Sequence, residues 1–462
     1  MLCRVFCALL FVAWTAERPI EFEPLLYWGR WRSPFRLFGP LFVSLPGVNL
    51  WAWQVLLFAL APLCLLRPGA FRNRAWVMDA AILASLTSIL VTLAWGLLRG
   101  GSAYQAYYQL WRFLTALLLG ALLPSVVRTS RDLKALGTAI LAAALTRGTL
   151  AIYFYWAHVH GKIDPPPAHM TSHDDSLLFV AGLVIALSWA LARGKLAAWL
   201  AAALAAPVLL YAMVLNNRRL AWVELALALA MTYLLLPPGG WRRRLNLLLP
   251  IVGPVLLVYV LVGWGRQGAV FAPVRALSTA GSNEDASSLA RQEEIRNLLY
   301  TLSAAGNPLL GTGWGVPYIK VTSVYANFGS EWQQYLYLPH NSLLAVAVFG
   351  GLVGICGIWL VVPVAAFLAT RGYRTSTRAV DRAAAMAVVS VLPAYGAQCF
   401  GDIGFESLTC ALILGVAIAV AGKAAVLTQL SPGLAKKGGA RRLRAPQMVA
   451  ADADLASLRQ WP

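Results

Sequence analysis

The residues with the clearest chemical potential lie in one stretch of the chain, residues 265–340. Two arginines stand in it five positions apart, Arg291 and Arg296, and it ends on His340, directly before a long apolar run. Arginine matches phosphate oxygens with a planar fork of N–H donors, and histidine exchanges a proton near neutral pH. A reaction at this stretch would therefore combine proton transfer with the binding of an anionic group.

His340 stands where a helix is expected to begin, because Asn341 and Ser342 are residues that cap helix N-termini. The partial positive charge of such an N-terminus favours an anionic group beside it. Two interpretations remain open: His340 handles a proton or an anionic oxygen at a membrane surface, or it is an interfacial histidine that faces water.

Residues 288–305 are expected to form an amphipathic helix on the outer face of a membrane. Glu293 and Glu294 suit its early turns, and a Gly-Asn-Pro sequence suits its end. Arg291 and Arg296 would flank this helix rather than share one line along it. The apolar residues recur at helical spacing: Leu289, Ile295, Leu298, Leu299 and Leu302.

A glycine-rich segment follows this helix, Leu309-Leu310-Gly311-Thr312-Gly313-Trp314-Gly315. It lacks the Lys-Ser/Thr pair of a nucleotide-binding loop. Its backbone N–H groups would form a nest for phosphate, or the segment is a tight turn that returns the chain to the membrane. The turn is the preferred interpretation.

Polar residues also stand in other connections expected on the same side. Arg266 is a candidate phosphate contact, and Asp402 and Glu406 are candidates to contact His340 or Arg291. Four residues after a run of prolines would bind an acceptor sugar or form a solvated turn, with the turn preferred: His169, His173, Asp174 and Asp175.

Three charged residues fall inside apolar runs, where a charge is costly unless it is paired or hydrated. They are Arg112, Arg147 and Glu224. The candidate substrate contacts are Asn341, Arg296, Asp402, His173 and Arg147.

The elements that must position these residues are membrane spans. Of the 462 residues, 59% are hydrophobic and only 12% are charged, whereas soluble domains carry about a quarter charged residues. Apolar runs near 20 residues cross a bilayer as helices, and their lack of strict alternation excludes a β-barrel. The chain is therefore expected to be an all-α polytopic membrane protein with about twelve spans: 2–16, 50–66, 76–98, 104–127, 135–158, 176–192, 197–215, 220–236, 247–264, 341–369, 383–400 and 407–423.

Charge in the connections predicts the orientation of these spans. Every second connection is rich in Lys and Arg, which places both termini in the cytoplasm and residues 265–340 outside. Most of the net charge of +19 then reflects topology, and no nucleic-acid partner is expected. Residues 2–16 are either a retained first span or a cleaved signal. Four regions follow: an N-terminal bundle of about nine spans, the large outer loop, a C-terminal bundle of about three spans, and a basic cytoplasmic tail near anionic lipid, at 1–264, 265–340, 341–424 and 425–462.

The chain resembles the O-antigen ligase/polymerase superfamily, most closely its lipopolysaccharide ligases. The resemblance is strongest over residues 216–356. Its basis is Arg291, Asn307-Pro308-Leu309-Leu310-Gly311-Thr312-Gly313-Trp314-Gly315, Pro339-His340-Asn341-Ser342 before a Gly350-Gly351-Leu352-Val353-Gly354 span, and Asn216-Asn217-Arg218-Arg219. The last match is looser, because Leu220 stands where a small residue is common, and whether Arg218 or Arg219 corresponds stays open.

The resemblance implies a GT-C-like glycosyltransferase of the bacterial inner membrane with its active site in the periplasm. It implies a donor glycan on undecaprenyl diphosphate and a lipid A–core acceptor. Arg291 and Arg218 or Arg219 would bind diphosphate, with Arg266 as a further candidate, and His340 would be catalytic.

The residues themselves agree with metal-independent chemistry. No paired carboxylates or histidine cluster point to a divalent metal, so arginines would neutralise the leaving diphosphate, and no cofactor is expected. The six cysteines all lie in apolar runs, which predicts neither a disulfide framework nor a metal site.

Four functions are compatible with the sequence. A ligase comes first, and a polymerase or a protein O-oligosaccharyltransferase of the same superfamily follows. A secondary transporter is the alternative from another class, but its polar residues would lie at mid-membrane, whereas these lie outside the spans. The motifs predict neither the identity of the sugars nor the oligomeric state.

Overall fold

A computed structural model describes residues 2–16, 42–45, 48–66, 74–164, 167, 169–266, 268–278, 286–321 and 335–428. The first half of the chain forms α1 (Leu2–Ala16), β1 (Phe42–Leu45), β2 (Val48–Trp51), α3 (Ala52–Leu65), α4 (Trp76–Leu98), α5 (Ala103–Val126), α6 (Ser130–Phe154), the π-helical turn η3 (Tyr155–Val159), α7 (Asp175–Arg193), α8 (Leu196–Asn216) and α9 (Arg219–Leu235). The second half forms α10 (Gly240–Gly263), η4 (Ala269–Phe271), α11 (Ala272–Ser278), α12 (Ala286–Ala304), α13 (Ser342–Val353), η7 (Gly354–Ile358), α14 (Val361–Thr375), α15 (Ala379–Gly401), η8 (Gly404–Glu406) and α16 (Leu408–Leu427).

The prediction of a polytopic helical membrane protein is confirmed. Within the described residues, nine helices are long and apolar enough to cross a bilayer. A helix occupies each of the twelve expected positions, but three of these helices have only 14 to 17 residues: α1, α3 and α9. The count of about twelve spans is therefore supported in part, because these three fall short of the ~20 residues that cross the hydrocarbon core at 1.5 Å per residue.

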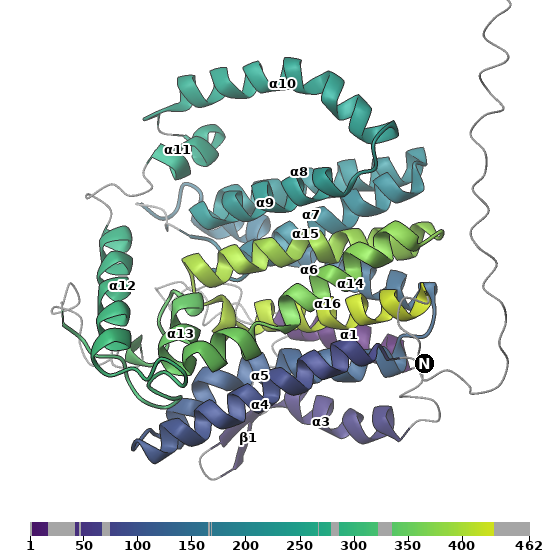
Figure 1. The fold of residues 1–462 in the computed structure, drawn as a ribbon. Helices are drawn as coiled ribbons and strands as arrows, with labels where there is room; N and C mark the ends of the chain where they lie inside the picture. The colour runs from purple at the N-terminus through teal and green to yellow at the C-terminus, as the bar shows by residue number, and fades with distance from the viewer. Residues whose placement is uncertain are drawn as a thin grey trace, which may run out of the picture.

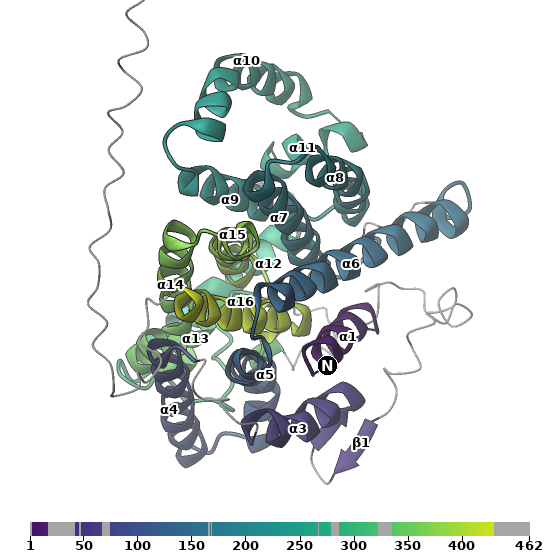
Figure 2. The ribbon, with the colours of Figure 1, turned by 90° about the vertical axis from the view of Figure 1, so that its right-hand side faces the viewer.

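The long helices run roughly side by side, and α16 lies at their centre (Figures 1 and 2). Most of α16 is buried, whereas the apolar part of α10 has no buried residues. Small residues permit the tight packing of α16 on α5: a Cβ on Gly415 would lie 2.8 Å from the Ala116 carbonyl oxygen. α10 instead arches away from the bundle (Figure 1), so its leucines and valines would face lipid.

The expected continuous span over 341–369 is broken in the structure. α13 ends around Gly351, which has φ 57° and ψ −153°, a conformation that only glycine adopts readily. A π-helical turn, η7, then leads into α14. Serines of α4 bind carbonyls freed at the break, Ser88 to Val353 (2.6 Å) and Ser85 to Gly357 (2.8 Å). Non-helical backbone is tolerated at membrane depth because neighbouring groups satisfy it in this way.

The large connection contributes a helix that crosses the end of the bundle. The expected helix over 288–305 is confirmed as α12, and it runs nearly at right angles to the bundle helices (Figure 1). Its inner face differs from the expected apolar stripe: Leu299 is half exposed, while Glu294, Asn297 and Thr301 are buried. These polar residues are buried because they bind the returning chain, as described below.

Two short strands modify the all-helical picture. β1 and β2 form an antiparallel hairpin with Phe42 opposite Trp51 and Leu45 opposite Val48. The hairpin directly precedes the second apolar helix, α3, which begins at Ala52 and not at the expected residue 50.

Candidate functional site

Connections far apart in sequence converge at the bundle end that α12 crosses. The α6–α7 connection, the α8–α9 turn, the chain entering α13 and the α15–α16 connection are joined there by side-chain contacts. The polar residues singled out in the sequence therefore lie largely at one end of the helices, as expected for groups outside the spans.

His340 is held by a carboxylate of α12. Its backbone N–H lies 3.0 and 3.1 Å from the two carboxylate oxygens of Glu294, and its Nδ1 lies 3.3 Å from one of them. The ring of Tyr335 stacks on the imidazole, with centroids 5.2 Å apart and planes within 7°. Glu294 is buried and His340 is about one-fifth exposed. A carboxylate beside Nδ1 favours the tautomer with the proton there, which leaves Nε2 as the basic nitrogen.

Two further residues of α12 hold the segment that returns toward the bundle. Asn297 Oδ1 accepts the backbone N–H of Val321 at 2.9 Å, and Thr301 Oγ1 accepts that of Ile319 at 2.8 Å. Both side chains are buried, so their polar groups require these partners. The inner face of α12 is thus an anchoring surface for chain that would otherwise leave N–H groups unpaired.

Helix α13 begins directly after His340 with the expected cap. The Asn341 side chain accepts the N–H of Leu344 at 3.0 Å, which confirms the predicted capping role of Asn341. Ser342 donates to the carbonyl of Asp402 and accepts the N–H of Phe405. These bonds tie the chain beside His340 to the α15–α16 connection.

Asp402 forms a second histidine–carboxylate pair. Its Oδ2 lies 2.6 Å from Nδ1 of His173, and its Oδ1 accepts the N–H of Ile403. Burial by itself would raise the pKa of Asp402. The hydrogen bond and charge of His173 outweigh burial, and with the positive charges of Arg291 and His340 they lower this pKa well below its ordinary value. Asp402 is therefore a buried carboxylate surrounded by cationic groups, which supports its expected proximity to Arg291 and His340.

A second acid of the same connection behaves differently. Burial raises the pKa of Glu406 well above its ordinary value, and the charge of Glu294 adds to this effect, while that of Arg112 opposes it. Burial therefore favours the protonated form of Glu406, whereas the cationic neighbours of Asp402 favour its ionised form. Different environments thus shift the pKa values of two nearby carboxyl groups in opposite directions.

Arg218 and Arg219 lie at the turn between α8 and α9, next to this cluster. Asn217 closes α8 in the left-handed conformation, with φ 50°, and Arg219 opens α9. Leu220 packs on Gly401, where a Cβ would lie 2.9 Å from its Cδ1. Because Gly401 immediately precedes Asp402, this contact places both arginine positions close to the His173–Asp402 pair.

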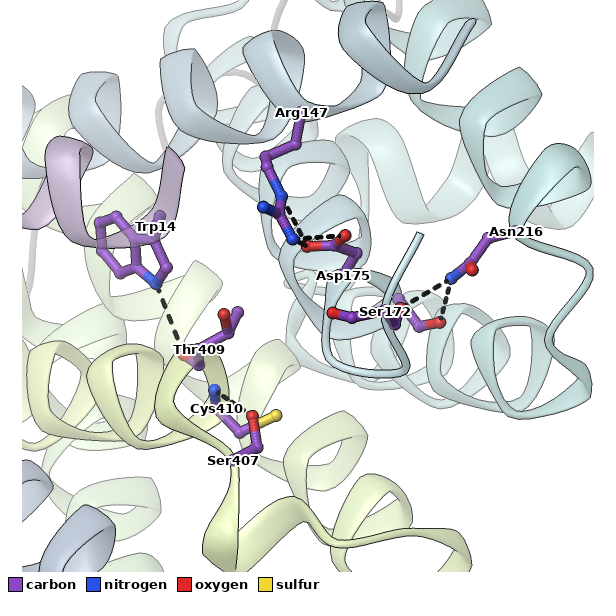
Figure 3. A network of polar contacts seen from close by, with 9 residues as sticks. Trp14, Arg147, Ser172, Asp175, Asn216, Ser407, Thr409 and Cys410 are labelled. Carbon is purple, nitrogen blue, oxygen red and sulfur yellow. Dashed lines mark hydrogen bonds and ion pairs between the residues drawn. The ribbon is translucent and has the colours of Figure 1, made fainter. Parts of the chain in front are cut away.

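The α6–α7 connection is also bound to the α8–α9 turn. His169 Nδ1 lies 3.0 Å from the carbonyl oxygen of Asn216. Asn216 in turn donates to the carbonyl of Ser172 and to Ser176 Oγ (Figure 3). Ser172 and Asp174 are buried, so the preferred interpretation of this connection as a solvated turn is wrong: packing against two helix ends withdraws it from water.

Arg147 is placed differently from the expectation of a substrate contact. It is 1% exposed and binds both oxygens of Asp175 at 2.7 Å (Figure 3). This bidentate pair joins α6 to the first turn of α7. Its attraction offsets the free energy of burying the Arg147 charge inside a span. Arg147 is therefore committed to this ion pair and is almost fully buried, which argues against the expected substrate contact.

The glycine-rich segment is a packed turn and not a phosphate nest. Thr312 and Gly313 donate their N–H groups to the carbonyls of Val348 and Phe349 at 2.8 and 3.0 Å. Gly315 donates to Gln109, and the indole of the fully buried Trp314 donates to Thr92. These N–H groups are already committed to α13, α5 and α4, which supports the interpretation as a turn.

Two expected contacts lie outside this group of residues. Arg266 is exposed in the turn after α10, and Arg296 is exposed on the face of α12 that points away from Glu294. Across the described residues there is also no group of three His, Cys, Asp or Glu side chains arranged to hold a metal ion.

The contact between Glu294 and His340 is not predicted by the sequence. The sequence predicts only that Glu294 is an acid in an early helical turn, whereas in the structure it holds His340. A signal was available: Glu294 lies three positions after Arg291, and residues at that spacing share one helix face. Arg291 and Glu294 would therefore lie on the same face of the helix, and this face could have been predicted to contact His340.

The fold and this site define a class of protein: a polytopic helical membrane protein with an arginine- and histidine-bearing polar site at one end of its helices. Residues 204–359 match the family model described as O-Antigen ligase. This segment, which runs from α8 to the end of η7 and includes His340, is thus similar to that family. No curated protein matches the chain.

Proposed function

We propose that the protein is an O-antigen ligase that transfers a glycan from undecaprenyl diphosphate to a hydroxyl group of lipid A–core oligosaccharide. The observation that carries this proposal is the Glu294–His340 contact, which orients an imidazole beside Arg291 and Asp402. An oriented histidine next to cationic groups suits attack by a hydroxyl on a carbon that bears a diphosphate leaving group.

In the proposed reaction His340 acts as the general base. Glu294 keeps the Nδ1 proton in place, and Nε2 removes the proton of the acceptor hydroxyl. The acceptor oxygen forms a bond to the anomeric carbon while the bond from that carbon to the diphosphate oxygen breaks. Attack from the opposite face inverts the anomeric configuration.

Arginines receive the negative charge that develops on the leaving diphosphate. Arg291 lies one helical turn from Glu294 on α12, and Arg218 and Arg219 lie at the α8–α9 turn beside Asp402. Arg266 is a candidate to join them, with Arg296, Asn341 and His173 as further candidate substrate contacts. Guanidinium groups bind phosphate oxygens in bidentate fashion, so no metal or other cofactor is required in this proposal.

The negative charge of Asp402 also has a place in this proposal. An ionised carboxylate among Arg291, His173 and His340 draws these side chains toward one point of the site. It would orient the groups that bind substrate, and not itself contact the diphosphate, since two anions repel.

The site is proposed to face the periplasm, with both termini in the cytoplasm of a bacterial cell and the chain in its inner membrane. Support comes from the distribution of charge, because connections at the end opposite His340 carry most of the Lys and Arg. The location of the polar cluster beyond the helix ends also argues against a secondary transporter, which binds substrate near mid-membrane.

A test uses the purified protein in liposomes with an undecaprenyl-diphosphate-linked glycan donor and lipid A–core acceptor, in chelator without added metal. We expect glycan on the core lipid with wild-type protein. His340→Ala and Arg291→Ala should each reduce transfer by at least about 100-fold, the usual contribution of a general base or a charge-stabilising group.

Matched controls separate these effects from general damage. His160→Ala removes an exposed histidine between α6 and α7, and Lys320→Ala removes an exposed cation between α12 and α13. Both variants should retain activity. Longer lipid-linked chains without core product would instead identify a polymerase, and glycan attached to protein would identify an O-oligosaccharyltransferase. Undiminished transfer by His340→Ala would exclude the proposed base.

A further inference from the structure

A second hollow of the molecule lies away from His340. It is an open pocket of about 260 Å³, lined by α6, α7, α8, α15 and α16. Its lining runs from the basic ends of the helices, at Lys134 of α6 and Val380 of α15, to the middle of the bundle, at Val416 of α16. Its volume approaches the lower end of small-molecule pockets, which is roughly 300 Å³.

The wall of this cavity is almost entirely apolar. Alanine, valine, leucine and isoleucine dominate the lining, and the exceptions are Lys134, Gly137, Thr138 and Trp189. Apolar cavities of this kind stay dry and take apolar ligands. One wall is α8, whose outer face exposes Leu196, Leu200 and Leu204, so the cavity lies just beneath a surface that faces lipid. An aliphatic chain is therefore the fitting occupant.

Cations gather beside this cavity. Lys134 Nζ and Arg193 Cζ lie 5.5 and 5.0 Å from the centre of the Trp189 ring, which itself lines the space. Arg378 donates to Ser130 Oγ at 3.4 Å and precedes Val380, another lining residue. All three cations are exposed. These cations could bind an anionic group at the mouth of the apolar cavity.

The nearby acids do not neutralise this arrangement. Asp132 accepts the backbone N–H groups of Arg128 and Thr129 and so caps α6. Asp381 is buried in the first turn of α15, where a carboxylate suits the helix N-terminus. The exposed charge beside the cavity is consequently positive.

We propose that this cavity binds one acyl chain of an anionic phospholipid, with the lipid phosphate on Lys134 and Arg193. The occupant is a lipid of the leaflet at the basic end and not the polyprenyl donor, whose diphosphate would bind at the opposite end of the helices. The bound lipid would join α6 and α8 to α15 across a space that side chains leave empty, and so stabilise the bundle.

The full-length protein provides the test. Protein delipidated in detergent is titrated with phosphatidylglycerol or phosphatidylcholine, and bound lipid is counted by native mass spectrometry while thermal unfolding is followed in parallel. We expect one phosphatidylglycerol to bind in preference to phosphatidylcholine and to raise the unfolding temperature. Each interfacial cation changes affinity about fivefold, so Lys134→Ala/Arg193→Ala should weaken phosphatidylglycerol binding about 30-fold.

Two variants complete the design. Gly137→Leu fills the cavity: a Cβ there would meet Ile185 Cγ2 at 3.5 Å, an ordinary contact, and it should abolish both binding and the thermal shift. Arg244→Ala removes an arginine that lies 4.7 Å from the Trp241 ring, away from the lining, and should bind lipid as the wild type does.

Several results would overturn the proposal. They are lipid binding that persists in Gly137→Leu, equal affinity for the two headgroups, or displacement of phosphatidylglycerol by undecaprenyl phosphate. If Gly137→Leu does not fold, Ala384→Leu, another filling substitution in the lining, replaces it and the same outcomes apply.

Discussion

Glu294 links the surface helix to the candidate base. Its carboxylate binds both the backbone and the Nδ1 of His340, so it fixes the position of the ring and its tautomer at once. A positioning residue of this kind contributes through His340 and makes no contact with substrate in the proposed reaction.

Substitution of Glu294 should therefore act on turnover. We predict that Glu294→Gln lowers kcat by roughly 10² to 10⁴ with a small change in KM, because the amide accepts the backbone N–H but does not stabilise a protonated imidazole. Glu294→Asp should recover part of the activity. Steady-state kinetics with lipid-linked donor measures both parameters.

A matched control is Glu293→Gln on the neighbouring, half-buried position of α12. It should leave both kinetic parameters near the wild-type values. If Glu294→Gln raised KM alone, Glu294 would contribute to substrate binding and not to orientation of the base.

At the scale of elements, the break in the helix that begins at Ser342 positions the glycine-rich turn. Gly351 lies so close to this turn that a Cβ would be 2.5 Å from the N atom of Gly311 and 2.6 Å from Leu309. The N–H groups of Leu352 and Val353 bind the carbonyls of Pro308 and Leu309 at 3.0 and 2.9 Å. The turn and the broken helix thus depend on each other, and through Asn307 they are joined to α12.

Gly351→Ala should damage this unit. Its positive φ and the clash with backbone atoms predict a loss of roughly 2–4 kcal/mol in unfolding free energy, together with reduced transfer activity. Gly253→Ala is the control: Gly253 lies in the exposed α10 with no atom near its Cβ position, and alanine there should be neutral or stabilising by up to about 1 kcal/mol. The measurement is thermal unfolding of both variants in detergent. Equal unfolding temperatures for Gly351→Ala and Gly253→Ala would contradict the role of the break.

At the scale of the whole molecule, the two ends of the bundle differ in character. One end carries buried acids, histidines and α12, and the other carries exposed lysines and arginines around an apolar cavity. This polarity suits a protein that takes substrates on one side of a membrane and is oriented by positive charge on the other.

The polarity predicts opposite labelling of two exposed lysine positions. In a cysteine-free background, Lys162→Cys at the His340 end should react with a membrane-impermeant maleimide added to intact spheroplasts. Lys195→Cys at the basic end should react only after the membrane is opened. Both lysines are exposed, so access and not burial decides the result. The reverse pattern would invert the proposed orientation.

The sequence alone determined much of this description. Apolar runs near 20 residues must become helices in a bilayer, since no other backbone arrangement within one segment satisfies its N–H and C=O groups. Local capping chemistry placed Asn341 at the start of α13, and residue types made His340, Arg291 and Asp402 candidates for a site. Each of these inferences depends on composition or on neighbours in the chain.

Only the tertiary structure decided which residues meet. Arg147 and Asp175 are 28 positions apart, and Glu294 and His340 are 46 apart. No local pattern distinguishes the first, a buried ion pair inside the bundle, from the second, which holds the proposed base. The break at Gly351 was likewise hidden, because its cause is the close approach of Gly311 from another segment. Contacts of this kind arise from packing between distant segments, and hydrophobic periodicity carries no information about them.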